Sequence, residues 1–475
     1  MSWEQFQVLA ANGIMWVAFA CFIIVALRNG ISLIQLLIAA WVFVTRVRPS
    51  EGARDLWHRY ADLALPITVI APALNEELSI VQSTKALLAL EYPEHEVIVV
   101  NDGSSDSTLD VLIEAFGMEE TQRTQIAALQ VTEVYRTFHS RRYPNLLVVD
   151  KENGRKADAA NAGIGFARTP LVCIIDADSI IEPDGLLRAA EPFMYDDGRL
   201  VAVGGAIRIA NGCTIRGGSL QKIGIADTMV PRFQVVEYLR AFLMNRVANA
   251  HMNTLMLISG AFGLFRRSTL VEMGGYRHDT VGEDLELVVR MHRHMRDQKR
   301  DYRIDFVPDI VCWTEAPAEL DGLDNQRARW QQGALETLQR HRGMILNPRY
   351  GRIGLLAMPQ IVLEDIFGPP AELLGYLVLP AAALLGLLDP MMAVAFFFVS
   401  VVFGCVLSLG TLALEEQQLR RTPNAKDLLR LGAAAVLENF GYRQINLWYR
   451  MAGIRRYFRN DTSWAAVPRV GLGKS

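Results

Sequence analysis

The strongest constraint in this sequence is a set of long apolar runs at both ends of the chain. Near the N-terminus, Phe6–Leu27 contains 22 residues without a charge, and Asn29–Thr45 adds 17 more after Arg28. A helix of about 20 apolar residues spans a bilayer, whereas a signal peptide has a basic start and a shorter apolar stretch. We therefore expect residues 1–46 to form an N-terminal transmembrane segment: one long tilted helix, with two short spans as the alternative.

The C-terminal part, residues 346–475, predicts a second membrane region. Its candidate spans are 366–388 and 390–414, with Asp389 alone between them. The stretch 428–440 is short for a span and contains charges, so we expect a re-entrant or interfacial segment followed by a cytosolic tail. Arginines gather after the first apolar run and after the last span, which places both ends in the cytosol. We expect a multi-pass protein of the inner cell membrane.

Composition excludes several classes of protein. Apolar residues make up 51% of the 475-residue chain and charged residues 21%, which excludes a disordered chain or a coiled-coil rod. The 48 basic side chains nearly balance the 51 acidic ones, whereas nucleic-acid-binding proteins usually carry a strong basic surplus. We therefore expect no nucleic acid partner. The five cysteines are widely spaced and indicate neither a disulfide framework nor a zinc site.

Between the two apolar ends, residues 47–345 alternate short apolar runs with helical patterns. The predicted elements are the strands Ile67–Ala71, Glu96–Val100, Leu146–Val149, Leu171–Ile175 and Val201–Gly204, and the helices Glu77–Leu90, Asp106–Phe116, Lys156–Ala167 and Asp184–Met194. The strand runs are almost continuously apolar, as in strands covered on both faces. The alternation predicts an α/β domain with a mostly parallel sheet, whose ligands bind beyond the carboxyl ends of the strands.

Two groups of acidic residues follow predicted strands. Asp102 ends one strand before Gly103, so its carboxylate can accept from a ribose hydroxyl or a base; a turn with a helix cap is the alternative. Asp176 and Asp178 follow another strand. Residues i and i+2 of a regular strand face the same side, so both carboxylates can reach one cation such as Mg²⁺. A solvated strand end is the alternative.

Charged side chains also stand at the start of two predicted helical runs. Glu283 and Asp284 follow Gly282 and can supply a general base; a favourable interaction with the helix dipole is the alternative. Lys156 comes two residues after Gly154, where a cation suits a phosphate or a uracil carbonyl; an exposed lysine is the alternative.

A third motif lies within a helical pattern. Gln326, Arg329 and Trp330 have the spacing i, i+3, i+4, so they share one helix face. Arginine binds phosphate through its planar fork, and the indole ring offers an apolar platform for a sugar. A membrane-surface helix is the alternative, because Leu335 and Leu338 have a similar spacing. Both interpretations can hold together.

In this order, the motifs resemble the membrane-bound, processive branch of glycosyltransferase family 2. That branch includes cellulose, hyaluronan, chitin-oligosaccharide and poly-N-acetylglucosamine synthases. The resemblance runs from about residue 65 to 345 and includes Pro72–Glu76, Ser259–Gly263 and Trp313–Glu315. It implies a cytosolic GT-A domain over residues 47–345, with a Rossmann-like sheet, an interfacial QxxRW helix and flanking transmembrane helices.

On the donor side, the resemblance implies a site for a UDP-sugar and a divalent cation. The residues implied to contact the nucleotide or line its pocket are Asp102 at the uridine, with Ala73, Glu76 and Lys156 around it. Asp178 is implied to ligate Mg²⁺ or Mn²⁺ on the diphosphate, and Asp176 to support it at the sugar-nucleotide.

On the acceptor side, the resemblance implies a base and a binding surface. Asp284 is implied to deprotonate the acceptor hydroxyl, with Glu283 beside it. The residues implied to hold the diphosphate and the acceptor are Gln326, Arg329 and Trp330, with Gly260 at the border of the acceptor site. One base without a protein nucleophile implies a single displacement with inversion at the anomeric carbon.

The sequence departs from the family pattern at a few positions. Gly282 stands where relatives carry the threonine of a TED tripeptide, Arg155 precedes Lys156, and Ala160 replaces a frequent leucine. These changes bear on nucleotide or donor preference more than on the type of reaction. The sequence Gln326–Gly333 favours UDP-N-acetylglucosamine over UDP-glucose as the donor, because it resembles the poly-N-acetylglucosamine synthases.

The expected function is therefore transfer of a sugar from a UDP-sugar to a growing β-linked polysaccharide at the lipid bilayer. Transfer of a single sugar to a lipid-linked acceptor is the first alternative, and a catalytically inert sensor or assembly subunit is the second. Because few spans are predicted, a channel for the polymer would need a secretion partner or a homo-oligomer.

Overall fold

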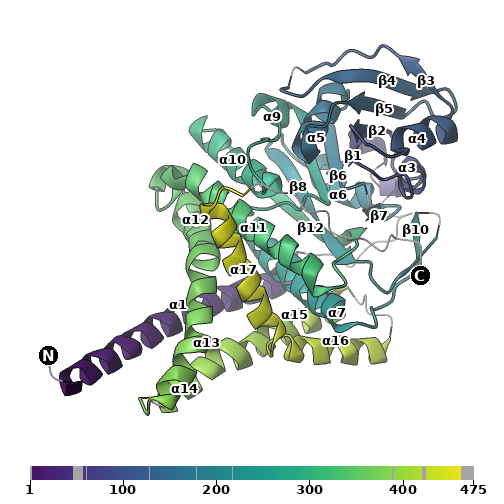
Figure 1. Ribbon diagram of the computed structural model, residues 1–475. Coiled ribbons are helices and arrows are strands. Elements are labelled where there is room, and N and C mark those ends of the chain that lie inside the picture. The colour runs from purple at the N-terminus through teal and green to yellow at the C-terminus, as the bar shows by residue number, and fades with distance from the viewer. Residues whose placement is uncertain are drawn as a thin grey trace.

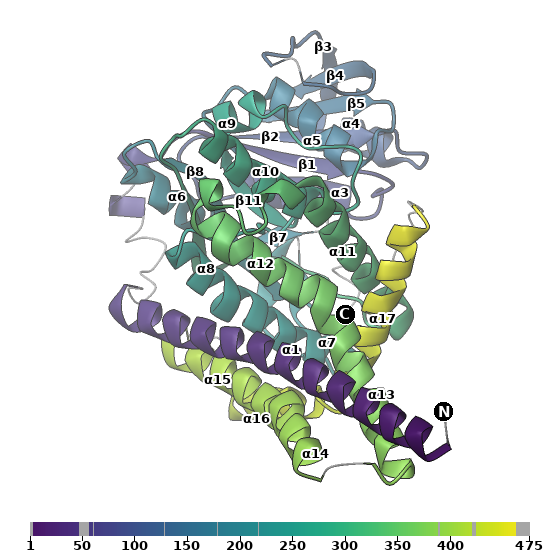
Figure 2. The same ribbon diagram turned by 90° about the vertical axis from the view of Figure 1, so that its left-hand side faces the viewer.

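The computed structural model describes residues 3–46, 57–59, 61–127, 129–177, 179–216, 218–387, 390–419 and 424–461. An α/β domain rests on a layer of long helices drawn from both ends of the chain (Figure 1). The turned view shows the N-terminal helix running beneath the domain, alongside the C-terminal helices (Figure 2).

The α/β domain is built on one large sheet. In the described part of the chain its ten strands have the order β3-β4-β5-β2-β1-β6-β11-β8-β12-β7. Their bounds are β1 Ile67–Ala73, β2 His95–Asp102, β3 Met118–Thr121, β4 Val134–Ser140, β5 Leu146–Lys151, β6 Leu171–Ile175, β7 Ile180–Ile181, β8 Leu200–Ile209, β11 Phe262–Arg266 and β12 Arg303–Thr314. A separate hairpin joins β9 (Thr214–Arg216) and β10 (Ser219–Lys222).

The five predicted strands are β1, β2, β5, β6 and β8, and most of their residues are buried, as fully covered strands require. Seven of the ten described strands run in one direction, yet the sheet is mixed, because β4, β7 and β11 run against the rest. The sequence analysis missed β11, which lies between β6 and β8 in the sheet and follows a long helical segment in the chain. A five-residue apolar run has no period that separates a strand from a helix.

Helices connect the strands and cover the sheet. They are η1 Ala61–Leu63, α3 Ile80–Leu88, α4 Thr108–Phe116, α5 Arg155–Phe166, α6 Gly185–Met194, α7 Met229–Leu239, η2 Arg240–Arg246, α8 Val247–His251, α9 Arg267–Glu272, α10 Glu283–Asp297, α11 Leu320–Arg340, η3 Arg342–Met344 and η4 Pro348–Tyr350. The four predicted helices correspond to α3, α4, α5 and α6. The largest difference in bounds is at α3, which begins three residues later than predicted.

The remaining helices form the layer below the domain. They are α1 Trp3–Thr45, η5 Ile353–Ala357, α12 Met358–Ile361, η6 Val362–Phe367, α13 Gly368–Leu384, α14 Pro390–Phe397, η7 Phe398–Val402, α15 Phe403–Gln418, α16 Ala425–Leu437 and α17 Tyr442–Phe458. Among the described helices, three are long and apolar enough to cross a membrane: 11–45, 353–384 and 390–417. The N-terminal helix is a single element. The middle one starts 13 residues before the predicted 366, because Glu364 and Asp365 weaken the apolar signal there.

Buried ion pairs explain why charged residues are tolerated in these helices. Glu372 on α13 is fully buried and pairs with Arg28 of α1. The same carboxylate accepts from Arg443 of α17, with 2.5 Å between Arg443 Nε and Glu372 Oε1. Charged groups at membrane depth normally face the bundle interior and pair with one another. This cluster therefore joins the N-terminal helix to two C-terminal helices.

Below pH 6.5 we expect the protein to lose stability, through His292 on α10. This histidine is buried, and burial lowers its pKa to about 4. Its Nε2 lies 2.8 Å from Leu255 O, so Nε2 carries the proton, and Nδ1 accepts from the Tyr302 hydroxyl at 2.7 Å. The unfolded chain binds a proton below about pH 6.5 and the folded chain does not until about pH 4. The free energy of unfolding should therefore fall by roughly 3 kcal/mol over that window.

Thermal melting between pH 7 and pH 4 tests this expectation. His292→Gln should lower the melting temperature at pH 7 and flatten its decline at lower pH. His139→Gln, at an exposed position on β4, is the matched control and should retain the wild-type profile. An unchanged pH profile in His292→Gln would contradict the assignment.

Candidate active site

One cavity of about 1340 Å³ lies between the carboxyl edge of the sheet and the helical layer. Every predicted site residue in the described part of the chain lines it: Ala73, Glu76, Asp102, Lys156, Asp176, Gly260, Glu283, Asp284, Gln326, Arg329 and Trp330. Asp178, the predicted metal ligand, lies outside the described residues. The cavity brings together residues that are up to 257 positions apart, from Ala73 to Trp330.

Asp102 ends β2 at one end of the cavity and is 2% exposed. Its Oδ1 accepts from Lys151 Nζ at 2.8 Å and from the backbone N–H of Gly154 at 3.0 Å. Both donors bind the same oxygen. The carboxylate is therefore held in one orientation at the wall of the cavity.

Lys151, at the end of β5, was missed by the sequence analysis. Its side chain is completely buried, and Nζ also contacts Asp158 Oδ1 at 2.5 Å and Thr132 Oγ1 at 2.7 Å. Because lysine is almost never fully buried unless it is paired, a lysine at the end of an apolar strand reads as exposed in the sequence. The fold instead places it between two buried carboxylates.

Lys156 and Asp176 meet at the centre of the cavity wall. Lys156 Nζ forms an ion pair with Asp176 and donates to Gly260 O at 3.2 Å. Burial lowers the pKa of Lys156, but attraction to Asp176, Glu283 and Asp284 outweighs this and holds the pKa above its usual value. The lysine is therefore a fixed positive charge among carboxylates.

The expected cation site is described only in part. Strand β6 ends at Ile175, so Asp176 lies beyond the strand. Asp178 is outside the described residues, so the expectation that both carboxylates reach one cation stays a prediction. No group of three or more acidic, histidine or cysteine side chains suited to a metal occurs within the residues described. Mg²⁺ is often held by one or two carboxylates with the oxygens of substrate phosphates, so Asp176 at the cavity wall fits such a cation.

Glu283 and Asp284 form the first turn of α10, opposite the loop that carries Gly260. Asp284 Oδ2 accepts from the backbone N–H of Gly260 at 3.3 Å, and Oδ1 accepts from Leu285 N–H at 2.9 Å. Burial raises the pKa of Glu283, which the attraction of Lys156 partly opposes. Both carboxylate oxygens of Asp284 are thus held by backbone N–H groups at the cavity wall.

The glycine that replaces the threonine of the TED tripeptide has a packing role. Gly282 precedes α10 and touches Gly333 of α11: a Cβ added to Gly333 would lie 2.7 Å from Gly282 Cα. The two glycines let the helix that carries Gln326 and Trp330 approach the acidic pair. This explains how the chain tolerates glycine at 282.

We expect Gly333→Ala to lower the rate of the sugar transfer that the sequence resemblance implies. The added methyl group would meet backbone atoms of Gly282 and Val281, which cannot turn aside as a side chain can, so α11 must move away from α10. A displacement of about 1 Å at a catalytic group costs up to roughly a hundredfold in rate. Release of nucleoside diphosphate measures the loss. Gly343→Ala is the matched control, since its Cβ would meet open space. Equal rates in the two variants would contradict the packing argument.

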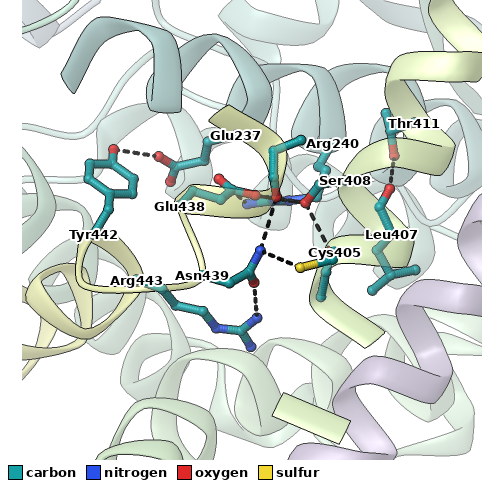
Figure 3. Close-up of polar contacts among 12 residues, drawn as sticks. Glu237, Arg240, Cys405, Leu407, Ser408, Thr411, Glu438, Asn439, Tyr442 and Arg443 are labelled. Atoms are coloured by element: carbon teal, nitrogen blue, oxygen red, sulfur yellow. Dashed lines mark hydrogen bonds and ion pairs between the residues drawn. The ribbon is translucent and has the colours of Figure 1, made fainter. Parts of the chain in front are cut away.

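The helix α11 presents its QxxRW residues to the cavity, and Arg327 between them is a further finding. Arg327 is buried, and its Nη2 donates to Glu237 Oε2 at 2.7 Å. Its guanidinium carbon lies 4.4 Å from the centre of the Trp330 ring. The Tyr442 hydroxyl donates to the same carboxylate oxygen at 3.2 Å (Figure 3). Arg327 therefore supports the Trp330 ring through its guanidinium, which Glu237 holds in place. The i, i+3, i+4 spacing of the motif does not predict this contact.

The cavity continues into the helical layer. Its far wall includes Arg240 and Glu438, which form an ion pair, and Ser408 donates to Glu438 at 2.7 Å (Figure 3). Arg28 and Glu372 of the buried charge cluster line it as well. The site thus extends from Asp102 to polar groups on the candidate membrane helices.

The fold is thus a mixed α/β domain whose cavity gathers acidic side chains with the arginine and tryptophan of one helix. The family model described as "Glycosyltransferase like family 2" matches residues 65–333, and the chain belongs to this family.

Similar proteins extend this result. A poly-beta-1,6-N-acetyl-D-glucosamine synthase of Staphylococcus epidermidis is 30% identical over 274 residues, 58% of this chain and 56% of that protein. The synthase of Staphylococcus aureus strain COL is 29% identical over 296 residues, 62% of this chain and 61% of that protein. The chain thus spans about three fifths of the length of these relatives. A solved mannosyltransferase of Pyrobaculum calidifontis, in complex with GDP-Man and Mn²⁺, covers 93% of this chain and 99% of its own at 18% identity, with a TM-score of 0.49.

Proposed function

We propose that this glycosyltransferase moves a sugar from a UDP-sugar to a growing β-linked polysaccharide, with inversion at the anomeric carbon. The observation that carries the proposal is that one cavity is lined by every predicted site residue in the described part of the chain and reaches the candidate membrane helices. We further propose that residues 47–345 are the cytosolic catalytic domain, between a membrane segment at 1–46 and a membrane region at 346–475.

The positions of the side chains support the following chemistry. Asp102 binds the uridine, and Lys156 and Arg329 place positive charge near the diphosphate. Asp284 takes the proton of the acceptor hydroxyl as that oxygen bonds to the anomeric carbon, and the bond from this carbon to the UDP oxygen breaks. Electrostatic stabilisation acts where charge develops on the leaving diphosphate. A donor with an α-linked nucleotide then gives a β-linked product.

A divalent cation, Mg²⁺ or Mn²⁺, would be held by Asp176 and Asp178 with the donor diphosphate. When bound, it would neutralise charge on the leaving group. We expect Asp178→Ala to abolish both activity and the response to added cation. Isothermal titration with Mn²⁺ in the presence of UDP is the measurement, because it reports binding without turnover. Full activity of the wild type after chelation would contradict the metal assignment.

UDP-N-acetylglucosamine is the donor we propose, in preference to UDP-glucose. The QxxRW segment favours it, and the two staphylococcal relatives are named as synthases of an N-acetylglucosamine polymer. The chain spans only part of those proteins, so the identity of the donor sugar is a separate proposal from the transferase activity.

The test of the proposed function is UDP release by the detergent-purified protein across a panel of UDP-sugars, with Mg²⁺ or Mn²⁺. Release with one donor, together with long product on a sizing gel, is the expected result. Absence of release with every donor, in a protein that remains folded, would reject the proposal.

Transfer of a single sugar to a lipid-linked acceptor is the second candidate. The observation in its favour is that Arg28 and Glu372 line the cavity from two candidate membrane helices, where a lipid-borne acceptor would enter. Product length separates the two candidates: a product of one added sugar on an extracted lipid would favour the second.

A further inference from the structure

The helix that follows β10 changes its geometry where it borders the cavity. Between α7 and α8, the segment η2 (Arg240–Arg246) is π-helical, a wider turn that is rare and is frequent at functional sites. Its residues Phe242, Asn245 and Arg246 line the cavity. None of them belongs to a motif found in the sequence.

Arg246 is held in place but lacks a full set of partners. Its guanidinium carbon lies 3.7 Å from the centre of the Phe242 ring, so the planar group is stacked. Its Nη1 is buried and has no hydrogen-bond partner among the residues described. Desolvation lowers the pKa of Arg246 to about 10, while Asp284 attracts its charge, so it remains a cation at neutral pH on the side of the cavity that holds the base.

Other polar atoms around the same cavity are also buried without a partner in the described part of the chain. They are Asn245 Oδ1 on the π-helical turn, Gln326 Oε1, Arg327 Nε and Arg327 Nη1 on α11, and Asn446 Oδ1 on α17. Buried polar atoms in native proteins almost always have partners, because an unpaired one costs free energy. A ligand rich in hydroxyl groups, next to the aromatic ring of Trp330, would satisfy both the guanidinium and the amides.

We propose that Arg246, with Asn245, forms part of the acceptor subsite and donates a hydrogen bond to an oxygen of the acceptor sugar, which turns the reacting hydroxyl toward Asp284. This inference rests on the proposed function and names a binding residue on its acceptor side. The donor side has its own cations: Lys156 pairs with Asp176, and Arg329 attracts Glu283. The ligand class is therefore an uncharged carbohydrate, and the donor diphosphate is the alternative outcome of the test.

The test compares binding and turnover in Arg246→Gln, Arg246→Lys and the wild type, in the full chain. The binding probe is an N-acetylglucosamine oligomer of about four residues, titrated into protein saturated with UDP, and UDP is titrated separately. We expect Arg246→Gln to weaken oligomer binding by about tenfold or more, since it removes a charged donor, and Arg246→Lys to weaken it less. UDP affinity should stay within about twofold. Arg141→Gln, at a side chain 80% exposed at a distance from the cavity, is the matched control.

Two results would overturn the inference. Equal oligomer affinity in wild type and Arg246→Gln would show that Arg246 does not contact the acceptor, and a loss of UDP affinity would assign it to the donor. If Arg246→Gln melts below the wild type, Phe242→Leu keeps the charge and removes its stacking platform, and it should also weaken oligomer binding. These measurements need no turnover, so they are distinct from a failure of the proposed function, which shows as absence of UDP release from the wild type.

Discussion

Asp284→Asn should lower UDP release by roughly 10²- to 10⁴-fold, the usual contribution of a positioned general base. The amide keeps the size of the side chain and can still accept from Gly260 N–H, which lies 3.3 Å from the present Oδ2. It has no basic oxygen to take the proton of the acceptor hydroxyl. Because no contact joins Asp284 to Asp102, UDP binding should survive in this variant.

The measurement pairs UDP release with UDP affinity in the same preparation. Asp279→Asn is the matched control: it lies on the loop that leads into α10, its side chain is 55% exposed, and it pairs with Arg277 and Arg340. Loss of UDP binding in a folded Asp284→Asn protein would contradict the assignment of the base. Wild-type turnover in that variant would transfer the role to Glu283.

Lys151→Met should reduce both stability and nucleotide binding. Methionine fills a similar volume but leaves Asp102 and Asp158 as buried carboxylates without their cation, and breaking a buried ion pair in this way costs about 3–5 kcal/mol. Asp102 also loses one of the two donors that orient it, so UDP affinity should fall in any protein that remains folded.

Melting temperature and UDP affinity together test this expectation. Lys85→Met, at an exposed lysine in the last turn of α3, is the matched control. The double variant Lys151→Met, Asp158→Asn removes one of the two buried carboxylates left without their cation, so it should recover part of the lost stability. If Lys151→Met melts like Lys85→Met, the buried network does not support the site.

The sequence analysis named residues that the structure gathers around one cavity, because its motifs are local in the chain. Asp102 and Asp176 follow strands whose apolar runs are plain in the sequence, and parallel strands bring their carboxyl ends to one edge of the sheet. Gln326, Arg329 and Trp330 share a face because a helix repeats every 3.6 residues. Such short-range rules place these side chains at one cavity, as the structure shows.

Lys151, Arg327 and Arg246 were missed for a common reason. Each is a basic side chain whose role depends on what surrounds it: Asp102 and Asp158 for Lys151, Glu237 and Trp330 for Arg327, Phe242 for Arg246. A basic residue in a sequence reads as exposed, since burial without a partner is costly. Only long-range contacts reveal the partner.

The sequence by itself determined the division into apolar ends and an α/β centre, five of the seven strands that run in one direction, and the chemical types of the candidate site residues, because these follow from local periodicity and composition. The tertiary structure alone decided the mixed order of the sheet, the close contact of Gly282 with Gly333, and the extension of the cavity to the charged groups of the candidate membrane helices. These features depend on packing between segments far apart in the chain, which no local pattern records.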